Sequence, residues 1–97
     1  MRIYIIRSSD QEENYIDRTL QVEKKMMDNG FNIMNPLPNQ NKHIGNKALN
    51  SIYGSLIPYC DAVYAMEGWD KTPSHTGDKE MAEAFIQRKT IIFEQKV

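Results

Sequence analysis

The chain has 97 residues, with 12 Lys and Arg against 13 Asp and Glu, and a formal net charge of −1. This length allows one compact domain, because a second core would leave each half too small to be stable without disulfides or metals. Hydrophobic residues make up 40% and charged residues 26%, which is close to the soluble globular average and argues against intrinsic disorder. We therefore expect a single domain over residues 1–97.

Several classes of protein and site are excluded by simple counts. The apolar runs are too short to cross a membrane, and the N-terminal run is too short for a secretory signal. The single cysteine, Cys60, excludes an intramolecular disulfide framework and indicates a cytoplasmic protein. His43 and His75 have no local ligand pattern, so we expect no metal site. The balanced charge argues against a nucleic-acid polymer as partner.

Four short apolar segments predict buried strands, at Ile3–Ile6, Phe31–Met34, Ala62–Met66 and Thr90–Phe93. Continuous apolar runs at this wide spacing are typical of a parallel sheet that is covered on both faces. The sequence therefore predicts an α/β three-layer sandwich of about four parallel strands with helices on both faces, similar to flavodoxin-like and Rossmann-like folds.

The first predicted helix has the clearest boundaries. Ser9 and Asp10 can each cap it, and each is followed three residues later by a glutamate, Glu12 or Glu13, as in a capping box. Gly30 is the expected left-handed end. Its apolar positions are one stripe and two residues beside it: Ile16, Leu20 and Met27, then Val22 and Met26.

Two more helices are expected between the later strands. The second covers part of Lys47–Ile57, and the third runs from about Asp78 to Arg88. We expect the third helix to bury three side chains, those of Met81, Ala84 and Phe85.

The carboxyl ends of the strands are the expected ligand-binding edge of such a sheet. This edge includes Arg7–Ser9 after the first strand, Asn35 and Pro36 after the second, and Glu67–Glu80 after the third. Asp61 precedes the third strand, so it belongs to the opposite edge and is expected to be structural.

Three segments carry a family resemblance, in the order RIYIIRSS, CDAVYAMEGW and SHTGDKEMAEAF, before a closing KTIIF. Together they resemble the short bacterial and phage branch of the nucleoside 2-deoxyribosyltransferase-like superfamily, over essentially the whole chain. The resemblance implies an N-glycosidase or deoxyribosyltransferase that acts on a nucleoside or nucleoside 5′-monophosphate without a metal or organic cofactor. It also implies a small-molecule partner.

In that superfamily a glutamate on a helix attacks the anomeric carbon of the sugar, and by position Glu80 matches it. Glu83, one turn later, is the alternative. A carboxylate suits this role because cleavage of an N-glycosidic bond develops oxocarbenium character, which a negative charge stabilises and can trap covalently. The resemblance also implies that Ser74 and Tyr53 contact the sugar.

Arg7, Ser8 and Ser9 could hold a 5′-phosphate, because they lead into a helix whose N-terminus favours an anion. The same residues could instead serve only to start that helix. Trp69 could stack on a base or pack against a neighbouring subunit.

His75 lies in the loop before the third helix and could donate a proton to the leaving base, or be an exposed bystander. Gly68 and Gly77 belong to the matching motifs and complete the predicted substrate site. We expect a homo-oligomer, because shallow sites of this type are often completed by a neighbouring chain.

Three departures from the family pattern support an alternative function. Arg7 and Ser8 replace a Gly-Pro pair, Gly77 is displaced by one position, and Tyr53 stands where an aspartate is usual. The alternative is a catalytically inactive module that binds a nucleotide-like metabolite. A third possibility is an interaction protein that docks a partner through the Trp69 loop.

Overall fold

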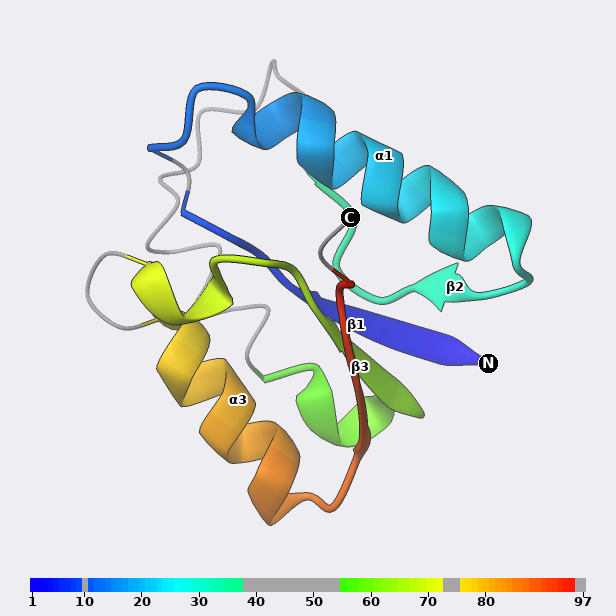
Figure 1. Cartoon of the computed structure of the whole chain (residues 1–97). Helices are drawn as coiled ribbons and strands as arrows, with labels where there is room; N and C mark the ends of the chain where they lie inside the picture. Colours follow the sequence, from blue (N-terminus) through cyan, green and yellow to red (C-terminus); the bar gives the residue numbers. More distant parts are fainter. Residues whose placement is uncertain (10, 38–54, 73–75, 96–97) are drawn as a thin grey trace.

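The computed structural model of the chain describes residues 1–9, 11–37, 55–72 and 76–95. In the described ranges the elements are β1 (Arg2–Ile6), α1 (Tyr15–Asp28), β2 (Asn32–Ile33), the 3-10 helix η1 (Ile57–Tyr59), β3 (Ala62–Ala65), the 3-10 helix η2 (Trp69–Lys71), α3 (Thr76–Ile86) and β4 (Thr90–Phe93). Figure 1 shows the strands at the centre of the molecule, with α1 and α3 on either side. Neither of these two helices is long and apolar enough to cross a membrane.

The strands form one parallel sheet in the order β2-β1-β3-β4, which confirms the predicted four-stranded parallel sheet. β2 is shorter than expected, and a side chain continues its pairing with β1. Asn35 Oδ1 accepts a hydrogen bond from the Ile5 N–H at 2.9 Å, and Asn35 Nδ2 donates to the Ile5 carbonyl at 2.8 Å. The buried side-chain amide of Asn35 therefore makes the two hydrogen bonds to β1 that the backbone of a further strand residue would make.

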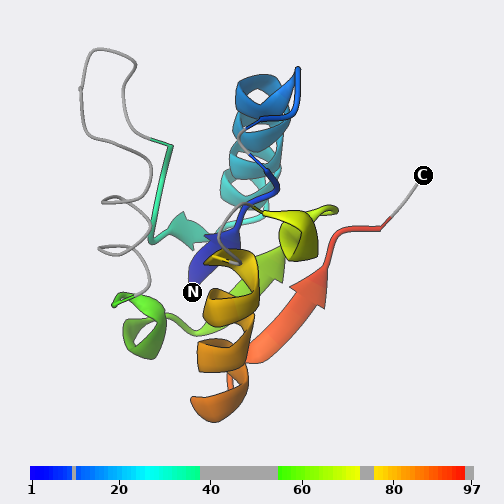
Figure 2. The ribbon, with the colours of Figure 1, turned by 90° about the vertical axis from the view of Figure 1, so that its left-hand side faces the viewer.

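Helices cover both faces of the sheet, as predicted (Figure 2). Because side chains alternate along a strand, Ile3 and Ile5 pack beneath α1 while Tyr4 and Ile6 pack beneath α3. The helix residues in these two clusters are Val22 and Met26 from α1, and Met81 and Ala84 from α3. The three-layer α/β sandwich is therefore confirmed.

The predicted capping boxes of the first helix are wrong, because α1 begins at Tyr15. Its N-cap is Asn14, which makes no side-chain cap hydrogen bond. The chain first makes a turn in which the Ser9 carbonyl accepts the Glu12 N–H at 3.2 Å. The Glu12 carboxylate pairs with Arg18, so it is not available to cap a helix at Ser9.

The face of α1 that meets the sheet also differs from the predicted stripe. Ile16, Leu20 and Met27 are exposed, at 43%, 48% and 56%. The buried residues of α1 are Thr19, Val22, Glu23 and Met26. The two polar ones can face inward because Thr19 Oγ1 donates to the Tyr15 carbonyl at 2.8 Å and Glu23 has partners of its own, described below.

α3 buries Met81 and Ala84, as expected, but Phe85 is 67% exposed. Phe85 is one residue beyond Ala84, so it projects about 100° away around the helix and past the sheet. The helix also starts earlier than expected, at Thr76, and ends at Ile86. The expected second helix falls outside the described residues, except for its end, where Ile57 begins η1.

Candidate functional site

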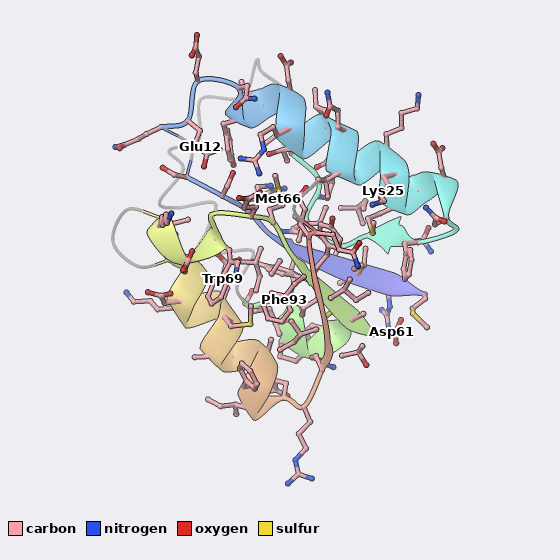
Figure 3. All side chains as sticks on the ribbon, in the orientation of Figure 1. Glu12, Lys25, Asp61, Met66, Trp69 and Phe93 are labelled. Atoms are coloured by element: carbon pink, nitrogen blue, oxygen red, sulfur yellow. The ribbon has the colours of Figure 1, made fainter. Side chains whose placement is uncertain are left out.

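The loops that follow β1 and β3 meet at the carboxyl edge of the sheet, where the sequence placed the site. Asp61 marks the opposite edge, as expected. Its Oδ2 accepts a hydrogen bond from the Arg2 N–H at 2.7 Å, and Figure 3 shows it at the other end of the sheet from Glu12. Asp61 is therefore a structural residue that joins the starts of β1 and β3.

The central feature of the site is a hydrogen bond between α3 and β1. Glu80 lies in the second turn of α3 and turns toward the sheet, where its Oε2 accepts a hydrogen bond from the hydroxyl of Tyr4. The Tyr4 side chain is fully buried. Within the part of the chain that the structure describes, Oε1 of Glu80 accepts no hydrogen bond, so one carboxylate oxygen is held and the other is not.

Burial raises the pKa of Glu80 to about 7, while the hydrogen bond from Tyr4 and the positive charge of Arg7 lower it in part. Burial and the neighbouring carboxylate both raise the pKa of Tyr4, so its hydroxyl stays neutral and remains a donor. Glu80 therefore changes its charge near neutral pH, as expected of acids, bases and nucleophiles in functional sites.

Tyr4 was not among the residues that the sequence singled out. A tyrosine within an otherwise apolar buried strand was nevertheless a usable signal, because a buried phenol hydroxyl usually finds a hydrogen-bond partner. The sequence did not indicate which residue that partner is.

Glu83 does not share this environment. Its Oε1 accepts a hydrogen bond from Gln87 Nε2 at 3.0 Å, in an exposed pair one turn apart on α3. Of the two glutamates that the sequence left open, Glu80 is the one that faces the sheet.

Arg7 follows β1 and lies beneath the edge of the sheet, with its side chain only 10% exposed. Its Nη2 donates to the Asn35 carbonyl and lies 3.7 Å from Glu23 Oε1 on α1. Glu23 also accepts the Leu37 N–H. The guanidinium is thus paired with a buried acid that sequence reasoning missed, because Glu23 looked like an ordinary surface residue of an amphipathic helix.

The two serines after Arg7 have different surroundings. Ser8 is 3% exposed, and among the described residues its Oγ has no hydrogen-bond partner. Ser9 Oγ accepts the Gln11 N–H at 3.2 Å. Since a buried hydroxyl without a partner is costly, Ser8 offers the stronger group for a ligand or a water molecule.

Gly68 and Gly77 allow close approaches around this edge. Gly68 has a φ of +91°, and a Cβ there would lie 3.0 Å from Glu12 Oε1 and 3.4 Å from Ser8 Cβ. A Cβ at Gly77 would overlap the carbonyl oxygen of Trp69. Both glycines thus have a structural reason in the fold, and Gly77 lets the start of α3 pack directly against η2.

Trp69 is half-buried and packs against the core cluster beneath α3. Its ring centroid lies 6.4 Å from that of Phe93, with the planes tilted by 46°, and Figure 3 shows the two side chains next to each other. The indole therefore has a partner within its own chain.

A charged network that sequence reasoning missed lies at the same edge. Arg18 pairs with Glu12 and lies 3.2 Å from Glu94 Oε1, and its Nη2 also donates to the Glu67 carbonyl at 3.2 Å. Glu94 Oε1 accepts the Glu67 N–H at 2.8 Å as well. Arg18 thus ties α1 to the ends of β3 and β4, which no local pattern of charges predicts.

Three predicted site residues, Tyr53, Ser74 and His75, lie outside the described residues. In the ranges that the structure does describe, no group of three or more His, Cys, Asp or Glu side chains could hold a metal ion.

Comparison with known proteins adds no relative to this picture, since no family model, curated protein or solved structure matches the chain. The fold and the site by themselves define an α/β three-layer sandwich that carries a partly buried carboxyl group at the carboxyl edge of its sheet. The function is therefore argued from that geometry and from the sequence motifs.

Proposed function

We propose that the protein is an N-glycosidase or deoxyribosyltransferase for a nucleoside or nucleoside 5′-monophosphate, with Glu80 as its nucleophile. The observation that carries this proposal is the Glu80 carboxyl group, which faces the sheet and is held at Oε2 by the buried Tyr4 hydroxyl. The resemblance to the nucleoside 2-deoxyribosyltransferase-like superfamily supports it, because it points to the same glutamate.

The reaction uses the ionised form of Glu80. Oε1 attacks C1′ of the sugar while the bond between C1′ and the base nitrogen breaks, and its electron pair leaves with the base. Tyr4 orients the carboxylate through Oε2 and stabilises its charge. The departing base takes up a proton from solvent. Water then attacks C1′, the bond from C1′ to Oε1 breaks, and the free sugar is released as the attacking water gives up a proton. A second base can attack in the same way, with loss of its own N–H proton, and give a new nucleoside. Either step restores the Glu80 carboxylate.

The groups after β1 support binding of the sugar end of the substrate. The buried Ser8 hydroxyl, which lacks a partner in the described ranges, suits a sugar hydroxyl or a phosphate oxygen. Arg7 acts differently from the sequence prediction in this proposal. Because it is paired with Glu23, it contributes the positive field that lowers the pKa of Glu80 rather than a free phosphate-binding group.

The test is to incubate the protein at pH 8 with a panel of nucleosides, deoxynucleosides and their 5′-monophosphates and to measure the free base released by chromatography. Wild type and the matched control Glu83→Gln should release base from the same substrate. Glu80→Gln should reduce the rate by at least about 100-fold, since removal of a covalent nucleophile costs several kcal/mol of transition-state stabilisation. Equal rates for Glu80→Gln and wild type would overturn the assignment of the nucleophile.

A second candidate is a binding module that leaves a nucleotide-like metabolite unchanged. The pKa of Glu80, about 7, favours it in one respect, because a protonated carboxyl group is a hydrogen-bond donor and not a nucleophile. In this case a member of the panel should raise the thermal midpoint of the protein and be recovered intact. Base release by wild type excludes this candidate.

A further inference from the structure

β4 forms one border of the sheet, and its outer side is unpaired among the residues that the structure describes. It pairs with β3 through Thr90–Phe93, and in the described part of the chain no strand pairs with its other side. Figure 2 shows β4 at the margin of the molecule, with α1 and α3 set back from it.

The side chains of β4 are unusually apolar for an open strand. Ile92 is 37% exposed and Phe93 is 54% exposed. Natural border strands usually carry a charged residue, a proline or a bulge, or are very short, because an open row of backbone groups invites pairing with another chain. The other border strand, β2, has only two residues, but Thr90–Phe93 has none of these protections.

The hydrogen bonds to β3 show which backbone groups of β4 point outward. The Glu94 N–H donates to the Ala65 carbonyl of β3 at 2.8 Å. Since the direction of the backbone groups alternates along a strand, Ile92 also points its N–H and C=O toward β3. Ile91 and Phe93 therefore point theirs away from the sheet.

We propose that β4 pairs antiparallel with β4 of a second copy of this chain, around a twofold axis normal to the sheet that passes between the two Ile92 residues. Ile91 of each copy then lies opposite Phe93 of the other, and these residues exchange their outward N–H and C=O groups. The two Ile92 residues form the central pair without hydrogen bonds. The two sheets become one sheet of twice the width.

The side chains select this register among those that the backbone allows. The twofold axis keeps each face of the sheet on the same side, so residues directly opposite each other must point to the same face. The alternative registers therefore differ by a shift of one residue in each strand, which moves the central pair from Ile92 to Ile91. With Ile92 at the centre, apolar residues meet apolar residues on both faces. With Ile91 at the centre, Lys89 would face Phe93 and Thr90 would face Ile92.

A second copy fits this strand better than an unrelated partner does, because in this register the apolar residues and outward backbone groups of β4 match those of an identical strand. The same residues supply both sides of the contact, as an isologous interface requires. The assembly also stops at two chains, since pairing uses the long open strand of each copy and leaves the short β2 strands at the ends. This interface does not depend on the proposed catalytic function.

The first test is the mass of the full chain in solution, measured by light scattering or sedimentation over a range of concentrations. Wild type should show the mass of two chains. Ile92→Lys should shift the equilibrium to one chain and raise the dissociation constant of the dimer by at least about tenfold. Ile86→Lys is the matched control, because Ile86 is 72% exposed on α3 and lies outside β4, and it should keep the wild-type mass.

The second test fixes the register. In an antiparallel ladder, two opposite residues that exchange no hydrogen bonds have their Cα atoms about 4.5 Å apart. The two Ile92 residues form such a pair, and this distance suits a disulfide. Ile92→Cys should therefore form a covalent dimer on mild oxidation, whereas Ile91→Cys should not. Wild type should not either, because its Cys60 is buried.

Three outcomes would overturn the proposal. Wild type could remain a monomer at high concentration, Ile91→Cys could cross-link in place of Ile92→Cys, or the chains could grow into larger aggregates instead of stopping at two. Loss of base release in Glu80→Gln with an unchanged dimer mass would confirm that the two proposals stand separately.

Discussion

Tyr4 on β1 donates its hydroxyl hydrogen bond to Glu80 on α3, across 76 positions of the sequence. The pair lies between the sheet and the helix, where Tyr4 is fully buried. The contact gives the carboxylate one fixed oxygen in a site whose burial raises its pKa to about 7.

We predict that Glu80→Gln makes stability less dependent on pH. The unfolded chain ionises Glu80 near its ordinary pKa of 4.5, but the folded chain does so only near 7. The unfolded state therefore binds fewer protons between these values, and the free energy of unfolding of wild type falls as pH rises through that window. The loss from this group is about 3 kcal/mol, and it is complete above pH 7.

Glu80→Gln lacks this loss, because an amide can accept the Tyr4 hydrogen bond without carrying a charge. Urea unfolding at pH 5 and pH 8 measures the difference between the variant and wild type, which should favour the variant more at pH 8. Glu83→Gln, on the same helix, should follow wild type at both pH values. A constant difference between Glu80→Gln and wild type would show that Glu80 does not titrate in this window.

Tyr4→Phe should raise the pKa of Glu80 above its wild-type value, because the hydroxyl hydrogen bond of Tyr4 lowers that pKa. At pH 8 the variant should also lose about 1.5–3 kcal/mol of unfolding free energy, as expected when a charged group loses a hydrogen bond. Carboxyl carbon shifts followed by NMR through the titration would report the pKa directly.

Tyr64→Phe is the control for Tyr4→Phe, since Tyr64 belongs to the cluster beneath α1 on the opposite face of the sheet. It should leave the titration of Glu80 unchanged. An equal effect of both substitutions would argue against a specific role of the Tyr4 hydroxyl.

Gly77→Ala should destabilise the protein by about 3 kcal/mol, at the upper end of the usual cost of overpacking. The new Cβ would overlap the Trp69 carbonyl oxygen, and the Trp69 carbonyl carbon lies 2.9 Å from the same position. Neither backbone atom can move without shifting η2. Thermal or urea unfolding checks this, with Lys79→Ala as an exposed control on the same helix that should change stability by less than about 0.5 kcal/mol.

The two acid–arginine pairs near the carboxyl edge should differ in how much they contribute to the free energy of unfolding. Glu23→Gln removes a carboxylate that lies 3.7 Å from the nearly buried Arg7, so we expect a loss of about 3 kcal/mol or more. Glu12→Gln weakens a more exposed pair with Arg18 and should cost less than about 1 kcal/mol. Denaturant unfolding of the two variants at one pH compares them, and a larger loss for Glu12→Gln would contradict the assignment of burial.

Much of the fold could be predicted because its signals are local. The four apolar runs predicted all strands to within two residues at each end, and β4 is found at Thr90–Phe93 as expected. The start of α1 and the exposure of Phe85 could not be predicted in this way. The start of α1 depends on the turn between Ser9 and Glu12 and on the pairing of Glu12 with Arg18. The exposure of Phe85 depends on where the axis of α3 lies on the sheet, and the sequence periodicity does not specify that placement.

The candidate site was predicted in outline. The order of strands and helices placed Glu80 at the carboxyl edge and Asp61 at the opposite one. The sequence also drew attention to Gly77, although the structure explains it by its closeness to Trp69. Arg7 was expected to face a ligand, yet the structure pairs it with Glu23, a residue that had no distinctive pattern.

The amino-acid sequence alone determined the parallel α/β sandwich and which loops lie at its carboxyl edge, since apolar runs and their spacing dictate which segments are buried and in what order. Only the tertiary structure decided which polar groups are partners. Tyr4 meets Glu80, and Arg18 meets Glu94, because packing of the helices against the sheet brings distant residues together. No pattern within a single segment encodes such a distance.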